Sequence, residues 1–167
     1  NFLNSQIMNF PILSSLILLP SIGALFLLFT KSNKEKNITV KYVALFTSLV
    51  NFFLSVYLWI LFDQSTSEFQ FVEDRIWIEG LINYKVGIDG ISILFIILTT
   101  FITPLCIISV NNSIKNRLRE FLIAILIMES FMIGVFCSLD LVVFYLFFEA
   151  GLIPMFLIIG IWGGTRR

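Results

Sequence analysis

Long apolar stretches separated by short polar segments run through most of this chain. A membrane-spanning helix needs about 20 consecutive apolar residues, and stretches of that length occur at 10–29, 42–62 and 86–110. Pro20 and Pro104 lie inside two of these stretches, and a membrane helix tolerates such a residue as a kink. The pattern predicts a helix in each stretch, and each helix crosses a bilayer once.

A fourth apolar stretch, 121–162, is too long for a single crossing. Asp140 is the natural corner of this stretch, because its side chain is suited to cap the N-terminus of a returning helix. We therefore predict a helical hairpin with spans at 121–139 and 141–162, which gives five membrane helices in all.

The segment 67–85 has an alternating pattern that is typical of strands. Apolar side chains recur at every second position on both sides of an acidic pair: Phe69, Phe71, Ile76 and Ile78. Glu79 and Gly80 are suited to a turn, so we predict a short β-hairpin or extended flap on the outer surface. Two aromatic side chains are expected near the lipid headgroups: Trp77 and Tyr84. An irregular loop fits the same residues equally well.

The charged residues are distributed asymmetrically between the predicted loops. Five crossings place nine of the eleven basic residues on one side: Lys31, Lys34, Lys36, Lys41, Lys115, Arg117, Arg119, Arg166 and Arg167. The opposite side carries five acidic residues against two basic ones: Asp63, Glu68, Glu73, Asp74 and Glu79 against Arg75 and Lys85. Basic loops stay on the cytoplasmic or matrix side, so we predict that the N-terminus is outside and the C-terminus inside.

The composition supports an all-α membrane protein that forms a single transmembrane domain over 1–167. Hydrophobic residues make up 58% of the chain and charged residues only 13%, which is too apolar for a soluble domain. The net charge is zero, so a nucleic-acid partner is not expected. The chain has no histidine, and Cys106 and Cys137 lack the spacing of a zinc or iron–sulfur site. We read both cysteines as buried small hydrophobic residues.

Two acids, Glu129 and Glu149, lie inside the predicted spans. At about 1.5 Å per residue, Glu149 lies about 13 Å from the Asp140 end of its helix, near the middle of a hydrocarbon layer about 30 Å thick. Glu129 follows Phe121 by eight residues and Glu149 follows Leu141 by eight, so antiparallel helices place both acids at comparable depth. A carboxylate at this depth is costly and normally marks an ion or proton path.

No lysine or arginine lies within the predicted spans, so Glu149 has no basic partner at its own depth. Either this acid is neutral, or its partner belongs to a missing portion of the protein or to another subunit. A carboxyl group with a movable positive partner acts as a proton switch, ionised beside the cation and protonated without it. The plainer alternative for both acids is a protonated glutamate that forms a hydrogen bond between helices.

Four further residues accompany the two acids. Pro154 cannot donate to the carbonyl of the residue after Glu149, which leaves that carbonyl free for water or a side chain. Tyr145 lies one turn before Glu149 on the same face, where its hydroxyl is placed to extend a hydrogen-bonded chain. Asp89 and Asp140 lie at the outer ends of the third and fifth spans, where they either serve the path or simply cap helix N-termini.

The segment around these residues, DLVVFYLFFEAGLIPMF at 140–156, resembles the fifth helix of NADH–ubiquinone oxidoreductase chain 4, an antiporter-like subunit of respiratory complex I. The stretches VGIDGIS at 86–92 and LTTFITPL at 98–105 are similar to the family's third helix, and LLPSIGAL at 18–25 is similar to its first. The resemblance covers nearly the whole chain but only the N-terminal part of the family, whose members are several times longer.

The resemblance implies the N-terminal part of an antiporter-like fold, with Glu149 as the proton-pumping acid and Glu129 as a second acid on the fourth helix. It also implies that the lysine partner of Glu149 comes from a later helix of the family. The expected function is a proton-translocating subunit of NADH:quinone oxidoreductase. No cofactor or metal is expected in this chain, and NAD, FMN, iron–sulfur clusters and ubiquinone are expected on other subunits.

The expected partners are the other membrane subunits of complex I, the downstream helices and the lipid bilayer, in a mitochondrial inner membrane or a bacterial plasma membrane. The chain begins with Asn1 and stops just outside an apolar run, so we expect an incomplete protein, and the resemblance implies the N-terminal fragment of a longer subunit or of a split gene product. The alternatives are a subunit of a multi-subunit cation/proton antiporter or membrane-bound hydrogenase, or a structural fragment without transport activity of its own.

Overall fold

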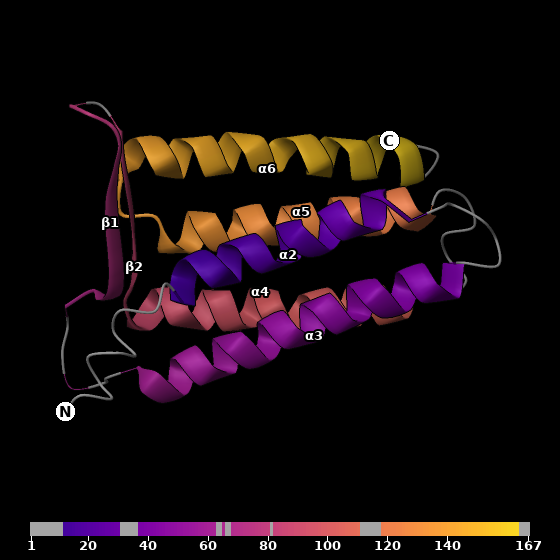
Figure 1. The fold of residues 1–167 in the computed structure, drawn as a ribbon, viewed down its shortest axis with the longest axis horizontal. Coiled ribbons are helices and arrows are strands. Elements are labelled where there is room, and N and C mark those ends of the chain that lie inside the picture. Colours follow the sequence, from indigo (N-terminus) through magenta and orange to yellow (C-terminus); the bar gives the residue numbers. More distant parts are fainter. Residues whose placement is uncertain are drawn as a thin grey trace.

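The computed structural model describes residues 12–30, 37–62, 65, 68–80, 82–110 and 118–163. Five helices lie within them: α2 Ile12–Leu28, α3 Asn37–Leu61, α4 Gly90–Ser109, α5 Leu118–Cys137 and α6 Leu141–Trp162. Figure 1 shows the helices side by side as one bundle, with a small sheet across one end. The predicted architecture of five apolar helices with a short flap is therefore confirmed.

The flap is a two-stranded antiparallel hairpin of β1 Gln70–Ile78 and β2 Ile82–Ile88. Its turn contains Glu79 and Gly80, and Gly80 has a φ of 78°, a left-handed conformation that only glycine adopts without strain. The structure thus confirms the predicted hairpin in place of an irregular loop. The side chain of Trp77, expected near the headgroups, lies outside the described residues.

The third span starts later than the sequence predicted. Residues 86–88, which were assigned to the helix, belong to β2, where Val86 pairs with Glu73 and Ile88 pairs with Gln70. The helix begins at Gly90, directly after its N-cap Asp89. The prediction failed because a short apolar run fits a buried strand as well as the first turn of a helix.

The other helix ends differ from the predicted spans by a few residues. Helix α3 begins at Asn37 and α5 at Leu118, so Lys41 and Arg119 are helical and not loop residues. A helix can continue past the apolar layer where long basic side chains reach the polar surroundings. A prediction from the apolar pattern alone therefore places the starts of α3 and α5 too late. The other seven basic residues on that predicted side lie outside the described part of the chain: Lys31, Lys34, Lys36, Lys115, Arg117, Arg166 and Arg167.

Helix α5 ends at Cys137 and not at the predicted 139, because the next two residues join the hairpin. The backbone nitrogen of Leu139 donates to the carbonyl of Lys85 at 2.9 Å, and Ser138 forms an isolated bridge with Val86. These contacts fix the corner between α5 and α6 against β2. The predicted bounds of the fifth span, 141–162, agree with α6.

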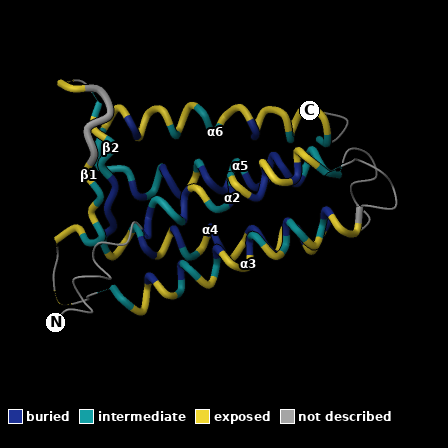
Figure 2. The backbone as a smooth tube through the Cα atoms, in the orientation of Figure 1, coloured by how far each residue is buried: buried dark blue, intermediate teal, exposed yellow. Residues whose placement is uncertain are grey.

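Helix α5 lies at the centre of the bundle and packs against α2, α3, α4 and α6. Two clusters of buried apolar side chains fill the interior, one at each end of the bundle, and α5 contributes to both. Figure 2 shows the contrast between α5, which is mostly buried, and α6, which is mostly exposed. Only Val143 and Pro154 of α6 are buried.

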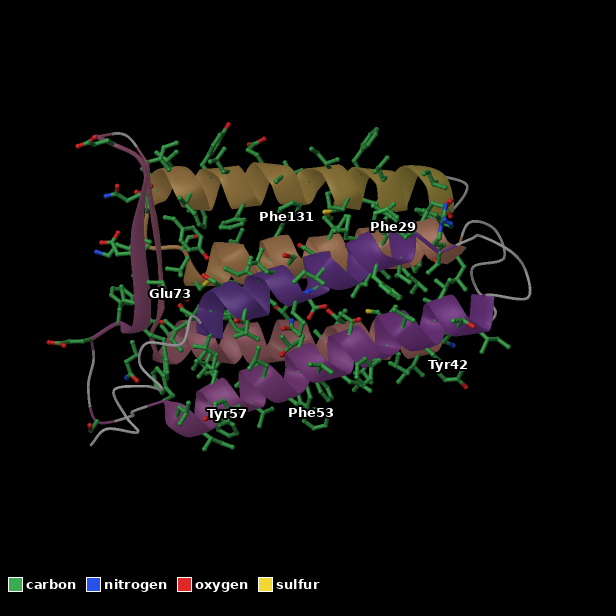
Figure 3. All side chains as sticks on the ribbon, viewed as in Figure 1. Phe29, Tyr42, Phe53, Tyr57, Glu73 and Phe131 are labelled. Atoms are coloured by element: carbon green, nitrogen blue, oxygen red, sulfur yellow. The ribbon has the colours of Figure 1, made fainter. Side chains whose placement is uncertain are left out.

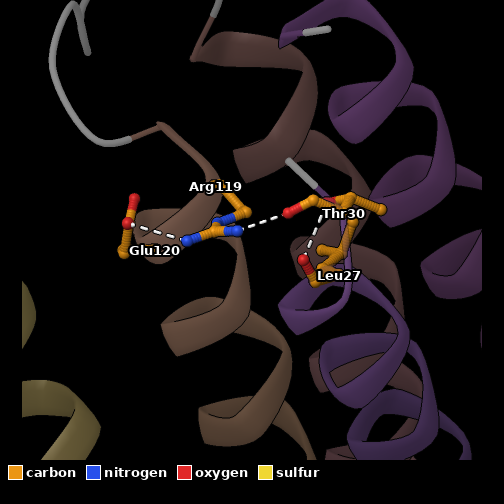
Figure 4. A network of polar contacts seen from close by, with 4 residues as sticks. All are labelled: Leu27, Thr30, Arg119 and Glu120. Carbon is orange, nitrogen blue, oxygen red and sulfur yellow. Dashed lines mark hydrogen bonds and ion pairs between the residues drawn. The ribbon is translucent and has the colours of Figure 1, made fainter. Parts of the chain in front are cut away.

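A polar contact joins the ends of α2 and α5 on the side away from the hairpin (Figure 4). The guanidinium of Arg119 donates to the backbone carbonyl of Thr30 and lies 3.4 Å from a carboxylate oxygen of Glu120. The Thr30 hydroxyl in turn donates to the carbonyl of Leu27 at 2.7 Å. Arg119 therefore holds the carbonyl end of α2, where the helix dipole favours a cation.

The outer surface of the bundle is apolar. Large hydrophobic side chains are exposed along the outward faces of the helices, and Figure 3 shows Tyr42, Phe53 and Tyr57 pointing away from α3. Four of the described helices are long and apolar enough to cross a membrane, and the fifth, α2, is an apolar helix of 17 residues. An apolar exterior of this kind is suited to hydrocarbon surroundings.

Candidate functional site

Glu129 lies in the interior of the bundle, where α5 packs against α3. Its side chain is 2% exposed, and Asn51, the facing residue on α3, is fully buried. The amide nitrogen of Asn51 donates to one carboxyl oxygen of Glu129 at 3.0 Å. The second carboxyl oxygen and the side-chain oxygen of Asn51 have no hydrogen-bond partner. A buried acid thus meets a buried amide across a helix interface.

Sequence reasoning missed Asn51. The signal was present as a polar stripe on an otherwise apolar helix: Ser48, Asn51 and Ser55, all buried. Spacings of three and four residues place such side chains on one face of a helix. Ser48 and Ser55 donate to carbonyls of their own helix, at 2.8 Å and 2.6 Å, so Asn51 is the member of the stripe that reaches across to α5.

Helix α4 adds polar groups beside this pair. The Thr100 hydroxyl lies 2.8 Å from that of Ser55, and Thr103 lies beside the carboxyl of Glu129. Thr103 itself donates to the carbonyl of Thr99 at 2.9 Å, so its hydroxyl is already used within α4. On the opposite flank, the hydroxyl of Ser130 meets that of Ser21 on α2 at 2.7 Å. The acid therefore lies in a polar zone that crosses four helices.

A groove with a volume of about 510 Å³ opens beside Glu129 between α4 and α5. Glu129, Thr99 and Thr103 are among its lining residues, and most of the wall is apolar. The groove connects the buried acid to the space next to the bundle. Glu129 is therefore buried from α3 but borders open space on the side of α4.

Glu149 lies on the outward face of α6 and is exposed in this chain. Tyr145, one turn earlier, is exposed on the same face, as the sequence predicted for this pair. Pro154 is buried inside the helix and faces the bundle. Among the described residues, no side chain forms an ion pair or hydrogen bond with the Glu149 carboxylate. Burial of Glu149 within these residues, as the sequence suggested, is not observed.

The two membrane acids lie at similar depth but face different surroundings. Phe147 of α6 lies against Gly134 of α5, and Phe131 of α5 lies against Gly151 of α6, so the two helices are antiparallel neighbours. This register places Glu129 and Glu149 within about one helical turn of each other along the bundle. Glu129, however, faces α3 and α4, whereas Glu149 faces away from the bundle. The structure does not bring them together as a pair.

Asp89 and Asp140 both cap helices, as one reading of the sequence predicted. Asp89 accepts the backbone N–H of Ser92 at 2.8 Å, and this hydrogen bond lowers the pKa of Asp89 below its usual value. Asp140 accepts the backbone N–H groups of Val142 at 2.8 Å and Val143 at 3.3 Å. A carboxylate is favoured at a helix N-terminus by the free N–H groups and the helix dipole.

Asp140 also connects α6 to the hairpin. Its second carboxylate oxygen accepts the backbone N–H of Asn83 on β2 at 3.3 Å. One side chain thus caps a membrane helix and ties it to the sheet. The described residues contain no group of three or more Cys, Asp or Glu side chains placed to hold a metal ion.

A family model for the amino terminus of NADH-ubiquinone oxidoreductase chain 4 matches residues 15–135, which include α3, α4 and most of α2 and α5. This chain belongs to that family. The chain 4 homologue of Marchantia polymorpha is 49% identical over 156 residues, which cover 93% of this chain and 31% of the relative. The NADH-quinone oxidoreductase subunit M of Rhodobacter capsulatus is 59% identical over 127 residues, 76% of this chain and 24% of the relative.

A chain of respiratory complex I from Thermus thermophilus with bound NADH has the same fold. The two chains superpose with a TM-score of 0.74 and 26% sequence identity over 93% of this chain and 30% of the other. The chain therefore spans about a third of the length of the chain 4 and subunit M proteins that it matches. Membership of the chain 4 family and the helical membrane fold confirm the resemblance seen in the sequence.

Proposed function

We propose that this chain is the N-terminal part of a proton-translocating membrane subunit of NADH:quinone oxidoreductase, with Glu149 as a proton carrier. The observation that carries the proposal is the position of Glu149 in the middle of an apolar membrane helix. The carboxylate lies on the outward face of α6 and has no positive partner within the described residues. Such a residue in a membrane helix normally faces protein or water and serves ion or proton movement.

The partner of Glu149 in this proposal is a lysine from a polypeptide segment outside these 167 residues, which packs on the outward face of α6. While the lysine is near, Glu149 is ionised; when the lysine moves away, the carboxyl takes up a proton. Tyr145 lies one turn away on the same face and offers a hydroxyl for the transfer. Pro154 leaves the carbonyl after Glu149 without its usual helical donor.

Electron transfer supplies the energy in this proposal, and it takes place on other subunits that bind NADH, flavin, iron–sulfur clusters and quinone. This chain contributes acids whose charge responds to the state of its neighbours. Glu129 is the second acid of the path, reached through the groove between α4 and α5. The complex lies in a mitochondrial inner membrane or a bacterial plasma membrane in this proposal, with the hairpin on the outer side, because nine of the eleven basic residues of the sequence belong to the opposite side when the chain crosses five times.

The test uses Glu149→Gln in the full-length subunit within its assembled complex. We expect coupled, NADH-driven proton pumping to be lost while the complex still assembles, because the amide has a similar shape but cannot carry the proton. Pumping is measured as acidification driven by NADH oxidation in sealed vesicles, and assembly by native gel electrophoresis. Glu79→Gln, in the exposed hairpin turn, is the matched control and pumps normally. Normal pumping by assembled Glu149→Gln complexes would contradict the proposal.

A further inference from the structure

The contact between Glu129 and Asn51 contains an imbalance of donors and acceptors. One hydrogen bond joins them, from the Asn51 amide nitrogen to one carboxyl oxygen at 3.0 Å. Two buried oxygens remain without a partner, Oε2 of Glu129 and Oδ1 of Asn51. When the glutamate is ionised, both oxygens are acceptors and each lacks a donor. A buried acceptor without a donor costs roughly 1–3 kcal/mol, and more when it is charged.

Among the described residues, no positively charged side chain lies beside Glu129. Helix α2 carries no titratable side chain, and the described charged residues of α3 and α5 lie near the helix ends, at Lys41, Arg119 and Glu120. Glu149 on α6 faces away from Glu129. The other titratable side chains on the described helices around Glu129 are cysteines and tyrosines: Tyr42, Tyr57, Cys106, Cys137 and Tyr145. The burial cost of a carboxylate is therefore not offset by a counter-charge.

We propose that Glu129 holds a proton in a paired acid–amide arrangement with Asn51. The protonated Oε2 donates to Oδ1 of Asn51 while the Asn51 amide donates to Oε1. A single proton thus satisfies both orphaned oxygens. Asn51 is a positioning residue in this arrangement: it orients the carboxyl and accepts its proton in a hydrogen bond, and Glu129 is the group that releases or receives the proton.

The groove between α4 and α5 gives the proton a way in and out. It is lined by Glu129 together with Thr99 and Thr103. Both threonine hydroxyls donate to carbonyls of their own helix, at 2.8 Å and 2.9 Å, so the oxygens that they present are acceptors. On release, the O–H bond of Glu129 breaks and the proton passes to a water molecule in the groove. The Asn51 amide then remains bonded to the carboxylate.

This inference deepens the proposed function and rests on it in one respect, because the held proton is one that the subunit passes on. The test is an infrared spectrum of the assembled complex with the full-length subunit, at neutral pH, in the region where protonated carboxylic acids absorb. We expect Glu129→Gln to lose one carboxylic acid band. We expect Asn51→Leu to shift that band to higher frequency, because the carbonyl loses its hydrogen bond.

Ser48→Ala is the matched control. Ser48 is buried on the same face of α3, one turn from Asn51, and its hydroxyl donates to the Leu45 carbonyl of its own helix. The control keeps the band at its wild-type frequency. If Asn51 has only a structural role, the carboxylic acid band of Asn51→Leu stays at the wild-type frequency. An unchanged band in that variant would therefore contradict the proposed hydrogen-bonded pair. An assembled Glu129→Gln complex that loses no band overturns the held proton.

If Asn51→Leu does not assemble, the wild-type spectrum itself tests whether Glu129 and Asn51 form the pair. A band at the low frequency of a hydrogen-bonded acid, assigned through its loss in Glu129→Gln, supports the pair; a band at the frequency of a free acid overturns it. Failure of the proposed function has a different signature. Normal pumping by Glu149→Gln contradicts that function, whereas the infrared band reports on the Glu129–Asn51 pair whether or not protons are pumped.

Discussion

Glu73 on the hairpin accepts two hydrogen bonds from Ser14 in the first turn of α2, from the backbone nitrogen at 3.0 Å and from the hydroxyl at 2.8 Å. The same hydroxyl lies 2.9 Å from that of Tyr84 on β2. Figure 3 shows Glu73 where the sheet meets the bundle. A single acid thus caps a membrane helix and fastens the hairpin to it, although the two residues are 59 positions apart in the chain.

Glu73→Ala is expected to loosen the hairpin from α2. The first-turn N–H of Ser14 loses its acceptor, and hydrogen bonds to a charged group are worth about 1.5–3 kcal/mol each, reduced here by partial exposure to water. Hydrogen–deuterium exchange of the β1 and β2 amides should become faster, and the melting temperature of the complex should fall. Asp74→Ala, at the exposed neighbouring position, is the control with little effect. Equal rates of hydrogen–deuterium exchange in the two variants would show that Glu73 does not fasten the hairpin to α2.

Gly134→Ala is expected to disturb the packing of α5 on α6. A Cβ at this position would lie 2.8 Å from ring carbons of Phe147, closer than such contacts occur. Overpacking of this kind costs about 1–3 kcal/mol. Gly160→Ala is the control: a Cβ there meets nothing within 4 Å, so this variant gains helix propensity and is neutral or slightly stabilising. Thermal unfolding of the purified complex checks the difference, and Phe147→Leu should partly rescue the Gly134→Ala variant.

Asp89→Ala is expected to lower the free energy of unfolding by about 1 kcal/mol, because α4 loses its N-cap. Asp89→Asn keeps most of the stabilisation by the cap, because asparagine is also a good N-cap residue. The Ser92 N–H holds the pKa of Asp89 below the ordinary value of 3.8, so the folded state favours the ionised form. The contribution of that charge is therefore complete above the unfolded-state pKa and is lost as the pH falls through the lower folded-state pKa. Unfolding of Asp89→Asn and wild type should thus differ by a constant amount near neutral pH and converge in strong acid.

Arg119→Met is expected to destabilise the bundle more than Glu120→Gln. Arg119 donates to the carbonyl of Thr30, just past the end of α2, a charge-assisted contact near a favourable helix end, and methionine replaces only its methylene groups. The ion pair with Glu120 is long at 3.4 Å and partly exposed, and pairs of this kind contribute about 0–1 kcal/mol. Melting temperatures of the two variants provide the comparison. A larger loss in Glu120→Gln would reverse this ranking.

Glu149→Asp tests how closely the proposed lysine must approach. The shorter side chain keeps the carboxyl group but withdraws it by one methylene, so we expect pumping to persist at a reduced rate. Coupled proton transport in sealed vesicles, compared with Glu149→Gln under the same conditions, provides the measurement. Equal loss in the two variants would show that a carboxyl group at this position is not sufficient, and the geometry of the partner would need revision.

The sequence predicted α6 fully because both of its ends carry strong local signals. Asp140 supplies the cap at its start, and the apolar run ends where glycine follows Trp162. The start of α4 was harder to place, since Val86 and Ile88 are as apolar as the helix and only their pairing with β1 reveals a strand. Strand pairing depends on residues far apart in the chain, which a local pattern does not contain.

The surroundings of the two acids depended on information that the sequence pattern lacked. In a helix such as α6, apolar all around, periodicity does not indicate which face turns inward, so the outward position of Glu149 was not predictable. The environment of Glu129 depends on Asn51, which lies 78 positions away. Each polar residue was visible in the sequence, but their meeting follows from how α3 packs on α5.

The small number of buried side chains on α6 has a consequence for biosynthesis. A helix with only two buried side chains gains little from its neighbours when it leaves the ribosome, so its partition into lipid depends on its own residues. An acid at the centre of such a segment opposes insertion into the membrane. The insertion penalty of an aspartate at a helix centre is about 3 kcal/mol, and we take the same order of magnitude for Glu149. The remaining apolar side chains of α6 must outweigh that penalty by themselves.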